Sequence, residues 1–142
     1  IINCLLKEFK MDLKILQIAA NTENNKVIKD HTHRAVQKNS ICGDKMEISL
    51  KVKKNKIIDF GYQCKSCIYC QASVSLLSNS SINKPVESIE SLLNEIENFF
   101  EDNLTNIPKE WKIFKQIFDK KNISRKDCLL LPFKAVSKAL KL

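Results

Sequence analysis

The sequence predicts an α+β domain in which helices cover one face of a small antiparallel sheet of about three strands. Residues 46–53 and 57–64 both alternate apolar with polar side chains, which is the pattern of a strand buried on one face. A short polar turn joins them, so they are expected to form a hairpin. After residue 64 the apolar side chains recur at helical spacing instead. Strands followed by helices favour helices packed on a single sheet.

One helix and one further strand are expected before the hairpin. Residues 11–20 (MDLKILQIAA) place apolar side chains along one face of a short helix, and the polar turn formers of NTENNK end it. Residues 33–41 have no clear period, which leaves an edge strand as one option. The sheet would then have its third strand beside the hairpin.

One face of the hairpin is predicted to point into the protein and the other to be exposed to solvent. The side chains expected to point inward in the first strand are Met46, Ile48, Leu50 and Val52. Those expected to point inward in the second strand are Ile58, Phe60, Tyr62 and Cys64. The turn between the strands falls at residues 54–56.

Several helices are expected after the hairpin, and the prolines indicate where three of them begin. Proline is tolerated in the first turn of a helix because the N–H that it lacks would have no partner within the helix there. The first helix begins near Cys67 and ends at SNSSINK. Pro85 opens the second helix and Pro108 the third. The last helix is predicted from about Leu131, because Pro132 would be costly deeper inside it. The residues expected to face inward are Cys67, Cys70, Val74 and Leu77; Ile89, Leu92, Leu93, Ile96, Phe99, Phe100 and Leu104; and Trp111, Phe114, Ile117 and Phe118.

Length and composition suit one domain, predicted to span residues 11–142. The chain has 142 residues, of which 44% are hydrophobic and 28% charged. Residues 1–10 are expected to be an N-terminal extension outside the folded domain, for which disorder is one option. They are too short and too charged for a secretory signal, and no apolar run is long enough to cross a membrane. The expected compartment is therefore the cytoplasm, where thiols stay reduced. Six cysteines there indicate metal or sulfur chemistry rather than disulfides.

The net charge of +8 comes from lysines spread along the whole chain. A nucleic-acid-binding protein more often concentrates its positive charge, so nucleic acid is not an expected partner. The densest cluster is KVKKNK at 51–56, which is expected to be a solvated hairpin tip. The functional alternative is a surface that attracts an acidic protein partner.

Four candidate metal ligands lie at predicted element boundaries. Cys67 falls at the start of a helix, with Ser66 as its expected N-cap, and a helix N-terminus lowers the pKa of a thiol. Cys128 is at or just before the start of the last helix. Cys42 precedes the first hairpin strand, where Gly43 allows a tight turn and Asp44 adds an oxygen ligand. Three thiolates and one carboxylate would meet where several elements come together.

The competing interpretation is that the C-x2-C-x2-C motif at residues 64–70 forms a metal site by itself. A ferredoxin run would need a fourth cysteine followed by proline, and a zinc ribbon would need a second C-x2-C pair. The chain has neither. Cys64 and Cys70 are therefore expected to be small buried side chains, with an auxiliary role in the metal site left open.

Three motifs in order resemble the NifU/IscU-type iron–sulfur cluster scaffold family, closest to its SufU-like branch. They are CGD at 42–44, C-x-x-x-Q-A-S-x-S at 67–75 and R-K-x-C-x-L-L-P at 125–132. The resemblance covers residues 11–142 and implies the family's fold. Carried over residue by residue, it implies Cys42, Asp44, Cys67 and Cys128 as ligands. The chaperone-binding LPPVK motif of IscU proteins is missing, so a SUF-type system fits better.

The resemblance also implies a function, which is that of a scaffold rather than an enzyme. A cysteine desulfurase would supply persulfide sulfur, with Cys128 as the acceptor candidate, and an iron donor would supply iron. A transient [2Fe–2S] cluster would form and pass to apo iron–sulfur proteins. The alternative is a zinc-dependent sulfur-transfer protein for a SUF-type desulfurase, since three thiolates and one carboxylate also suit Zn2+. Both alternatives use the same ligands.

Overall fold

The computed structural model describes residues 13–39, 43–100, 107 and 109–142. Within them the chain runs as a helix at residues 13–19, then β1 (His33–Lys38), β2 (Lys45–Lys53), β3 (Lys56–Lys65), α2 (Ile68–Ser81) and α3 (Val86–Phe99). Two 3₁₀ segments, η1 (Lys109–Gln116) and η2 (Lys120–Arg125), lead into α4 (Lys126–Leu140). The described strands form one antiparallel sheet in the order β1-β2-β3. The predicted fold class is confirmed, including β1 as the edge strand.

The hairpin follows the predicted alternation except near its tip. Lys54 and Asn55 both have positive φ angles and form the two-residue turn. The pairing of β2 with β3 shifts between Lys51 and Val52. Because this irregularity advances the register by one residue, Ile57 is fully buried and Ile58 is exposed. The prediction that Ile58 points inward was therefore wrong, whereas Phe60 and Tyr62 are buried as expected.

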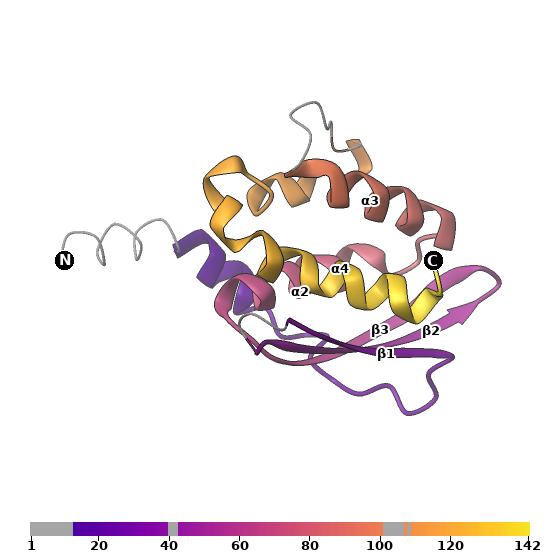
Figure 1. The fold of residues 1–142 in the computed structure, drawn as a ribbon. Helices are drawn as coiled ribbons and strands as arrows, with labels where there is room; N and C mark the ends of the chain where they lie inside the picture. The colour runs from indigo at the N-terminus through magenta and orange to yellow at the C-terminus, as the bar shows by residue number, and fades with distance from the viewer. Residues whose placement is uncertain (1–12, 40–42, 101–106, 108) are drawn as a thin grey trace.

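Two helices, α2 and α4, lie on one face of the sheet (Figure 1). Helix α2 packs against β3 and α4, and α4 also packs against β1 and β2. Most of α2 is buried, and its buried residues include four serines as well as apolar side chains: Ser73, Ser75, Ser78 and Ser81. This middle layer carries two of the candidate ligands.

The outer layer of α3 and η1 covers the far side of these helices (Figure 1). Helix α3 buries the predicted stripe of Ile89, Leu92, Leu93 and Ile96. Trp111 and Phe114 are fully buried, and Phe114 stacks edge-on against Phe133 of α4 with centroids 5.6 Å apart. The predicted inward face is confirmed here, although the segment is 3₁₀ rather than α-helical. Leu104 and Pro108, two further predicted positions, lie outside the described residues.

Helix α4 begins at Lys126, so the predicted start near Leu131 was wrong. Pro132 lies in the helix interior and removes the hydrogen bond that its N–H would donate to the carbonyl of Cys128. Leu129 and Phe133 on either side are almost completely buried. Burial of such side chains is worth about 1.5–3 kcal/mol each, which offsets the cost of the proline.

The segment between the first helix and β1 crosses the other face of the sheet. Ile28 N–H donates to Ser49 Oγ (3.2 Å), and Tyr62 N–H donates to the carbonyl of Asn24 (3.0 Å). A side chain on Gly61 would lie 2.5 Å from the carbonyl of Lys26, so only glycine allows this approach. Ser49 and Gly61, on the face predicted to be wet, are buried for this reason.

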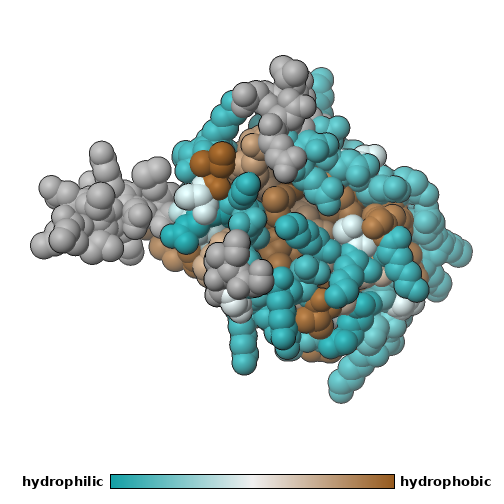
Figure 2. All heavy atoms as spheres, viewed as in Figure 1, coloured by the Kyte–Doolittle hydropathy of each residue, from teal (hydrophilic) through white to brown (hydrophobic). Residues whose placement is uncertain are grey.

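The surface seen in Figure 2 is mainly hydrophilic, with hydrophobic residues showing between the hydrophilic ones. Among the described residues, the large apolar side chains that remain exposed are Leu13, Leu16, Val27, Ile58, Ile113, Ile123 and Leu142. None of the described helices is both long and apolar enough to cross a membrane.

Candidate metal centre

Asp44, Cys67 and Cys128 converge at one point where three elements of the fold begin. One ligand atom from each lies within 4.8 Å of the other two. The three residues come from the loop before β2, the start of α2 and the first turn of α4. Cys42, the fourth predicted ligand, lies outside the described residues, as does Cys4.

The loop before β2 positions Asp44. Gly43 N–H donates to the carbonyl of Asn39 (2.9 Å), and Asn39 N–H donates to the carbonyl of Asp44 (2.8 Å). Gly43 has a φ of +72°, which is the tight turn that the sequence predicted. Asp44 is 7% exposed, and its buried Oδ2 has no hydrogen-bond partner among the described residues. A buried carboxylate oxygen without a donor fits a metal ligand, because a cation would compensate its charge.

Cys67 is itself the N-cap of α2, so the prediction of Ser66 in that position was wrong. Its backbone is extended, and its carbonyl accepts the first helical hydrogen bond from Gln71 N–H (3.1 Å). The Gln71 side chain donates to the carbonyl of Ser66 (2.9 Å), which fixes the approach to the helix. The Cys67 thiol makes no capping hydrogen bond within the described part of the chain and is half-buried. It is therefore available to a ligand beside the N–H groups of the first helical turn.

Cys128 is the third residue of α4 and is 4% exposed. Buried Ser73 of α2 donates its hydroxyl to the carbonyl of Leu129 at 2.6 Å, which ties the first turn of α4 to α2. A second tie places the guanidinium of Arg125 over the ring of Tyr69, 5.2 Å from its centroid. Both ties hold the start of α4 against the start of α2.

The residues that make these two contacts, Ser73, Tyr69 and Arg125, were not predicted from the sequence to support the centre. Ser73 belongs to the A-S-x-S motif at 72–75 and lies close to Cys70, Val74 and Leu77 on the predicted inner face of the helix. Its burial could therefore have been expected from the sequence. A buried serine needs a partner, which here is a backbone carbonyl. The pair of Tyr69 and Arg125 had no signal in the sequence, because its members are far apart in the chain.

The two remaining cysteines of the 64–70 motif lie near the centre but outside the group of three ligand atoms. Cys70 is fully buried in the core, as expected for a small buried side chain. Burial raises the pKa of the Cys70 thiol far above its usual range, and nearby Cys64, Cys67 and Asp44 raise it further. Cys64 is half-buried at the end of β3, and burial likewise raises the pKa of its thiol. Both thiols are therefore protonated at neutral pH.

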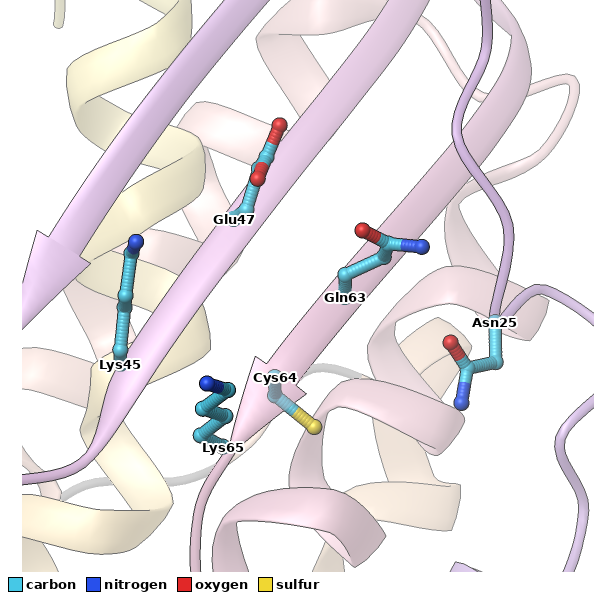
Figure 3. Close-up of a pocket in the computed structure, with 6 residues that line it drawn as sticks. All are labelled: Asn25, Lys45, Glu47, Gln63, Cys64 and Lys65. Carbon is cyan, nitrogen blue, oxygen red and sulfur yellow. The ribbon is translucent and has the colours of Figure 1, made fainter.

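A cavity of about 310 Å³ opens beside Cys64 on the outer side of the hairpin (Figure 3). Its lining includes Lys45 and Lys65, which face each other across β2 and β3, together with Glu47 and Gln63. The two lysines make the end of the hairpin next to the centre positively charged.

Comparison with known proteins identifies the family. A sequence profile described as NifU-like N terminal domain matches residues 11–139. The chain belongs to this family. The predicted resemblance to the NifU/IscU type is thereby confirmed.

Two related sequences cover most of this chain. One is an uncharacterized protein of Borreliella burgdorferi, 32% identical over 117 residues, which are 82% of this chain and 81% of that protein. The other is the iron-sulfur cluster assembly scaffold protein IscU of Thermotoga maritima, 34% identical over 111 residues and 73% of each chain.

Two solved structures share the fold. The N-terminal NifU-like protein of Brucella abortus matches with a TM-score of 0.83 and 21% identity over 91% of this chain and 90% of that one. The putative SUF-system scaffold protein of Fervidobacterium islandicum matches with a TM-score of 0.80 and 22% identity over 90% and 94%.

Proposed function

We propose that this protein is an iron–sulfur cluster assembly scaffold that builds a transient [2Fe–2S] cluster and transfers it to apo-proteins. The observation that supports it most is the convergence of Asp44, Cys67 and Cys128 from three separate elements. Thiolates are the ligands that iron–sulfur clusters prefer. Cys42 is proposed as the fourth ligand from its place in the CGD motif. The family membership and the scaffold relative support the same function.

A zinc-dependent sulfur-transfer protein is the second candidate. The ligand atoms lie close enough together to suit one tetrahedral ion, which is the geometry of Zn2+ bound by thiolates and a carboxylate. The structural likeness to a SUF-system protein is compatible with this role. The two candidates differ in the cargo and not in the ligands.

The proposed partners are a cysteine desulfurase, an iron donor and apo iron–sulfur proteins, in the cytoplasm. Cys128 is proposed to accept persulfide sulfur, because it lies in the first turn of α4 beside the other two ligand atoms. The lysines beside the centre, Lys45 and Lys65, would attract an acidic desulfurase surface.

Anaerobic reconstitution distinguishes the two candidates. The metal-bound protein is purified, its iron and zinc are measured, and a cysteine desulfurase, cysteine and Fe2+ are added. A scaffold acquires [2Fe–2S] absorbance and loses it to an apo-acceptor. A zinc sulfur carrier keeps its metal, raises desulfurase turnover and builds no cluster. Absence of a cluster, of stimulation and of persulfide on the protein would contradict both.

The salt dependence of the stimulation tests the basic surface. Added salt should weaken the effect, because screening limits the reach of exposed charges to about 10 Å at 0.1 M. The double variant Lys45→Gln/Lys65→Gln should reduce both the stimulation and its salt dependence. Lys141→Gln, at the other end of α4, is the control for a lost positive charge.

Asp44 is proposed to keep the cluster labile, since a carboxylate binds soft iron–sulfur centres less well than a thiolate. Asp44→Ala should therefore slow the decay of visible absorbance when an apo-acceptor is present. Asp127→Ala removes a carboxylate beside Cys128 in the sequence and is the control. The absorbance of its cluster should decay at the wild-type rate. Faster decay in Asp44→Ala would show that the carboxylate holds the cluster instead of loosening it.

A further inference from the structure

Three lysines lie in one row across the sheet, at the end of the hairpin next to the candidate centre. Lys45 of β2 is directly opposite Lys38 of β1 on one side and Lys65 of β3 on the other. Directly opposite residues project from the same face of a sheet with Cβ atoms about 4.5–5.5 Å apart, so the three side chains are neighbours. All three are exposed, and none forms an ion pair within the described part of the chain. Like charges in this arrangement repel one another, so an anion bound to the row would stabilise it.

The cavity beside Cys64 lies at this row and carries a net positive charge. Lys45 and Lys65 line it from the adjoining ends of β2 and β3 (Figure 3). The carboxylate in its lining, Glu47, is already bound by Arg34, whose two nitrogen atoms lie 2.8 and 2.9 Å from Glu47 Oε1. Both lysine charges therefore remain uncompensated. The volume of about 310 Å³ has room for a molecule of several carbon atoms and is larger than a single small ion needs.

The rest of the lining indicates which class of anion fits. Gln63 of β3 and Asn25 of the loop before β1 add side-chain amides, which can donate hydrogen bonds to further oxygen atoms (Figure 3). The described residues that line the cavity include no aromatic side chain, so a nucleobase would have no ring to stack on. They also include no glycine and no helix N-terminus, which are typical of phosphate sites. Carboxylates held by separate lysines and amides suit this lining better.

We propose that this cavity binds a small polycarboxylate anion, whose carboxylates pair with Lys45 and Lys65, with Lys38 completing the row. The site adjoins the candidate centre, because Lys45 directly follows Asp44, with Cα atoms about 3.8 Å apart, and Lys65 is two residues before Cys67. The proposed function uses the same lysines to attract an acidic desulfurase. A bound polycarboxylate therefore competes with that partner. The competition rests on the proposed function, whereas the binding of the anion does not.

Binding is tested on the metal-free protein with citrate as the probe, by calorimetry and by NMR of the backbone amides at constant ionic strength. Citrate should bind at a single site, and the amide shifts should be confined to Asn25 and to the ends of the strands that carry the lysine row. Lys45→Gln/Lys65→Gln should weaken the binding about tenfold and Lys38→Gln about threefold, because pairs of exposed charges each contribute modestly.

Lys53→Gln/Lys56→Gln is the matched control. These two lysines are also exposed and directly opposite each other on β2 and β3, but they lie at the other end of the hairpin and do not line the cavity. This variant loses the same charge and should bind citrate as tightly as the wild type. Equal weakening in both double variants would show a general effect of charge and would overturn the proposal.

Three other probes test the class of ligand. Acetate has one carboxylate, inorganic phosphate is a compact anion, and a glutamate-rich peptide represents an acidic protein surface. Each should bind more weakly than citrate at the same ionic strength. The proposal is overturned if acetate or phosphate binds as tightly as citrate, or if the peptide binds to these lysines and citrate does not.

The competition is tested in the desulfurase assay with tricarballylate, a tricarboxylate that lacks the metal-chelating hydroxyl of citrate. It should reduce the stimulation of the desulfurase more than sodium chloride of equal ionic strength does, and this excess should vanish in Lys45→Gln/Lys65→Gln. Equal effects of the two salts on the wild type would overturn the competition. A protein that binds citrate at the lysine row but never stimulates a desulfurase would contradict the proposed function and not the binding site.

Discussion

The starts of α2 and α4 each bring a thiol to the same centre, but they hold it differently. Cys67 is a half-buried N-cap whose side chain makes no capping bond to the described residues. Cys128 lies inside the helix, is 4% exposed and is followed by tightly packed Leu129 and Leu131. The comparison indicates one adjustable thiol and one fixed thiol. Under the proposed function this difference is useful, because the fixed thiol would keep the geometry of the centre while the adjustable thiol would let the cluster enter and leave.

The largest expected effect comes from removing the ligands themselves. Cys42→Ser, Cys67→Ser and Cys128→Ser should each lose most of the bound metal or cluster, measured per chain after anaerobic reconstitution. Cys4→Ser, Cys64→Ser and Cys70→Ser should retain it, because these thiols are not proposed ligands. If Cys64→Ser or Cys70→Ser abolished binding while Cys128→Ser did not, the metal would be held by the 64–70 motif alone.

A smaller effect is expected from the serine that ties the two helix starts together. Ser73→Ala removes the hydrogen bond to the Leu129 carbonyl and should lower the free energy of unfolding by about 1 kcal/mol. Ser75→Ala is the matched control, since this buried serine of the same helix donates to Asn21 instead (2.8 Å). Both variants should unfold at lower denaturant, but only Ser73→Ala should also weaken metal binding. Equal metal affinity in both would show that Cys128 is held without this bond.

The smallest effect is expected from the contact between Arg125 and Tyr69. Arg125→Ala removes the cation–π contact with Tyr69 and should cost about 0.5–1 kcal/mol of stability at this exposed position. Lys84→Ala removes a similar contact with Trp111, 5.6 Å from the ring centroid and on another part of the fold. Metal should dissociate faster from Arg125→Ala than from Lys84→Ala at similar stability, measured by transfer to a chelator. Identical dissociation rates would remove Arg125 from the support of the centre.

The sequence by itself determined the parts of the fold that depend on local patterns. The alternation in residues 45–53 is a property of neighbouring side chains, so it identified β2 and its buried residues Met46, Ile48 and Leu50 correctly. The same holds for the stripe of α3 and for the turn at Gly43. The motifs around Cys42, Cys67 and Cys128 also sufficed to recognise the family.

Only the tertiary structure decided the details that depend on contacts between distant residues. The register shift that buries Ile57 in place of Ile58 is set by pairing with β2. Helix α4 runs through Pro132 because burial of Leu129 and Phe133 outweighs one lost hydrogen bond. The start of α2 at Ile68, which makes Cys67 its N-cap, and the bond of Ser73 to the Leu129 carbonyl of α4 also depend on such contacts. Local spacing leaves these choices open, since the free energies that decide them come from packing between elements.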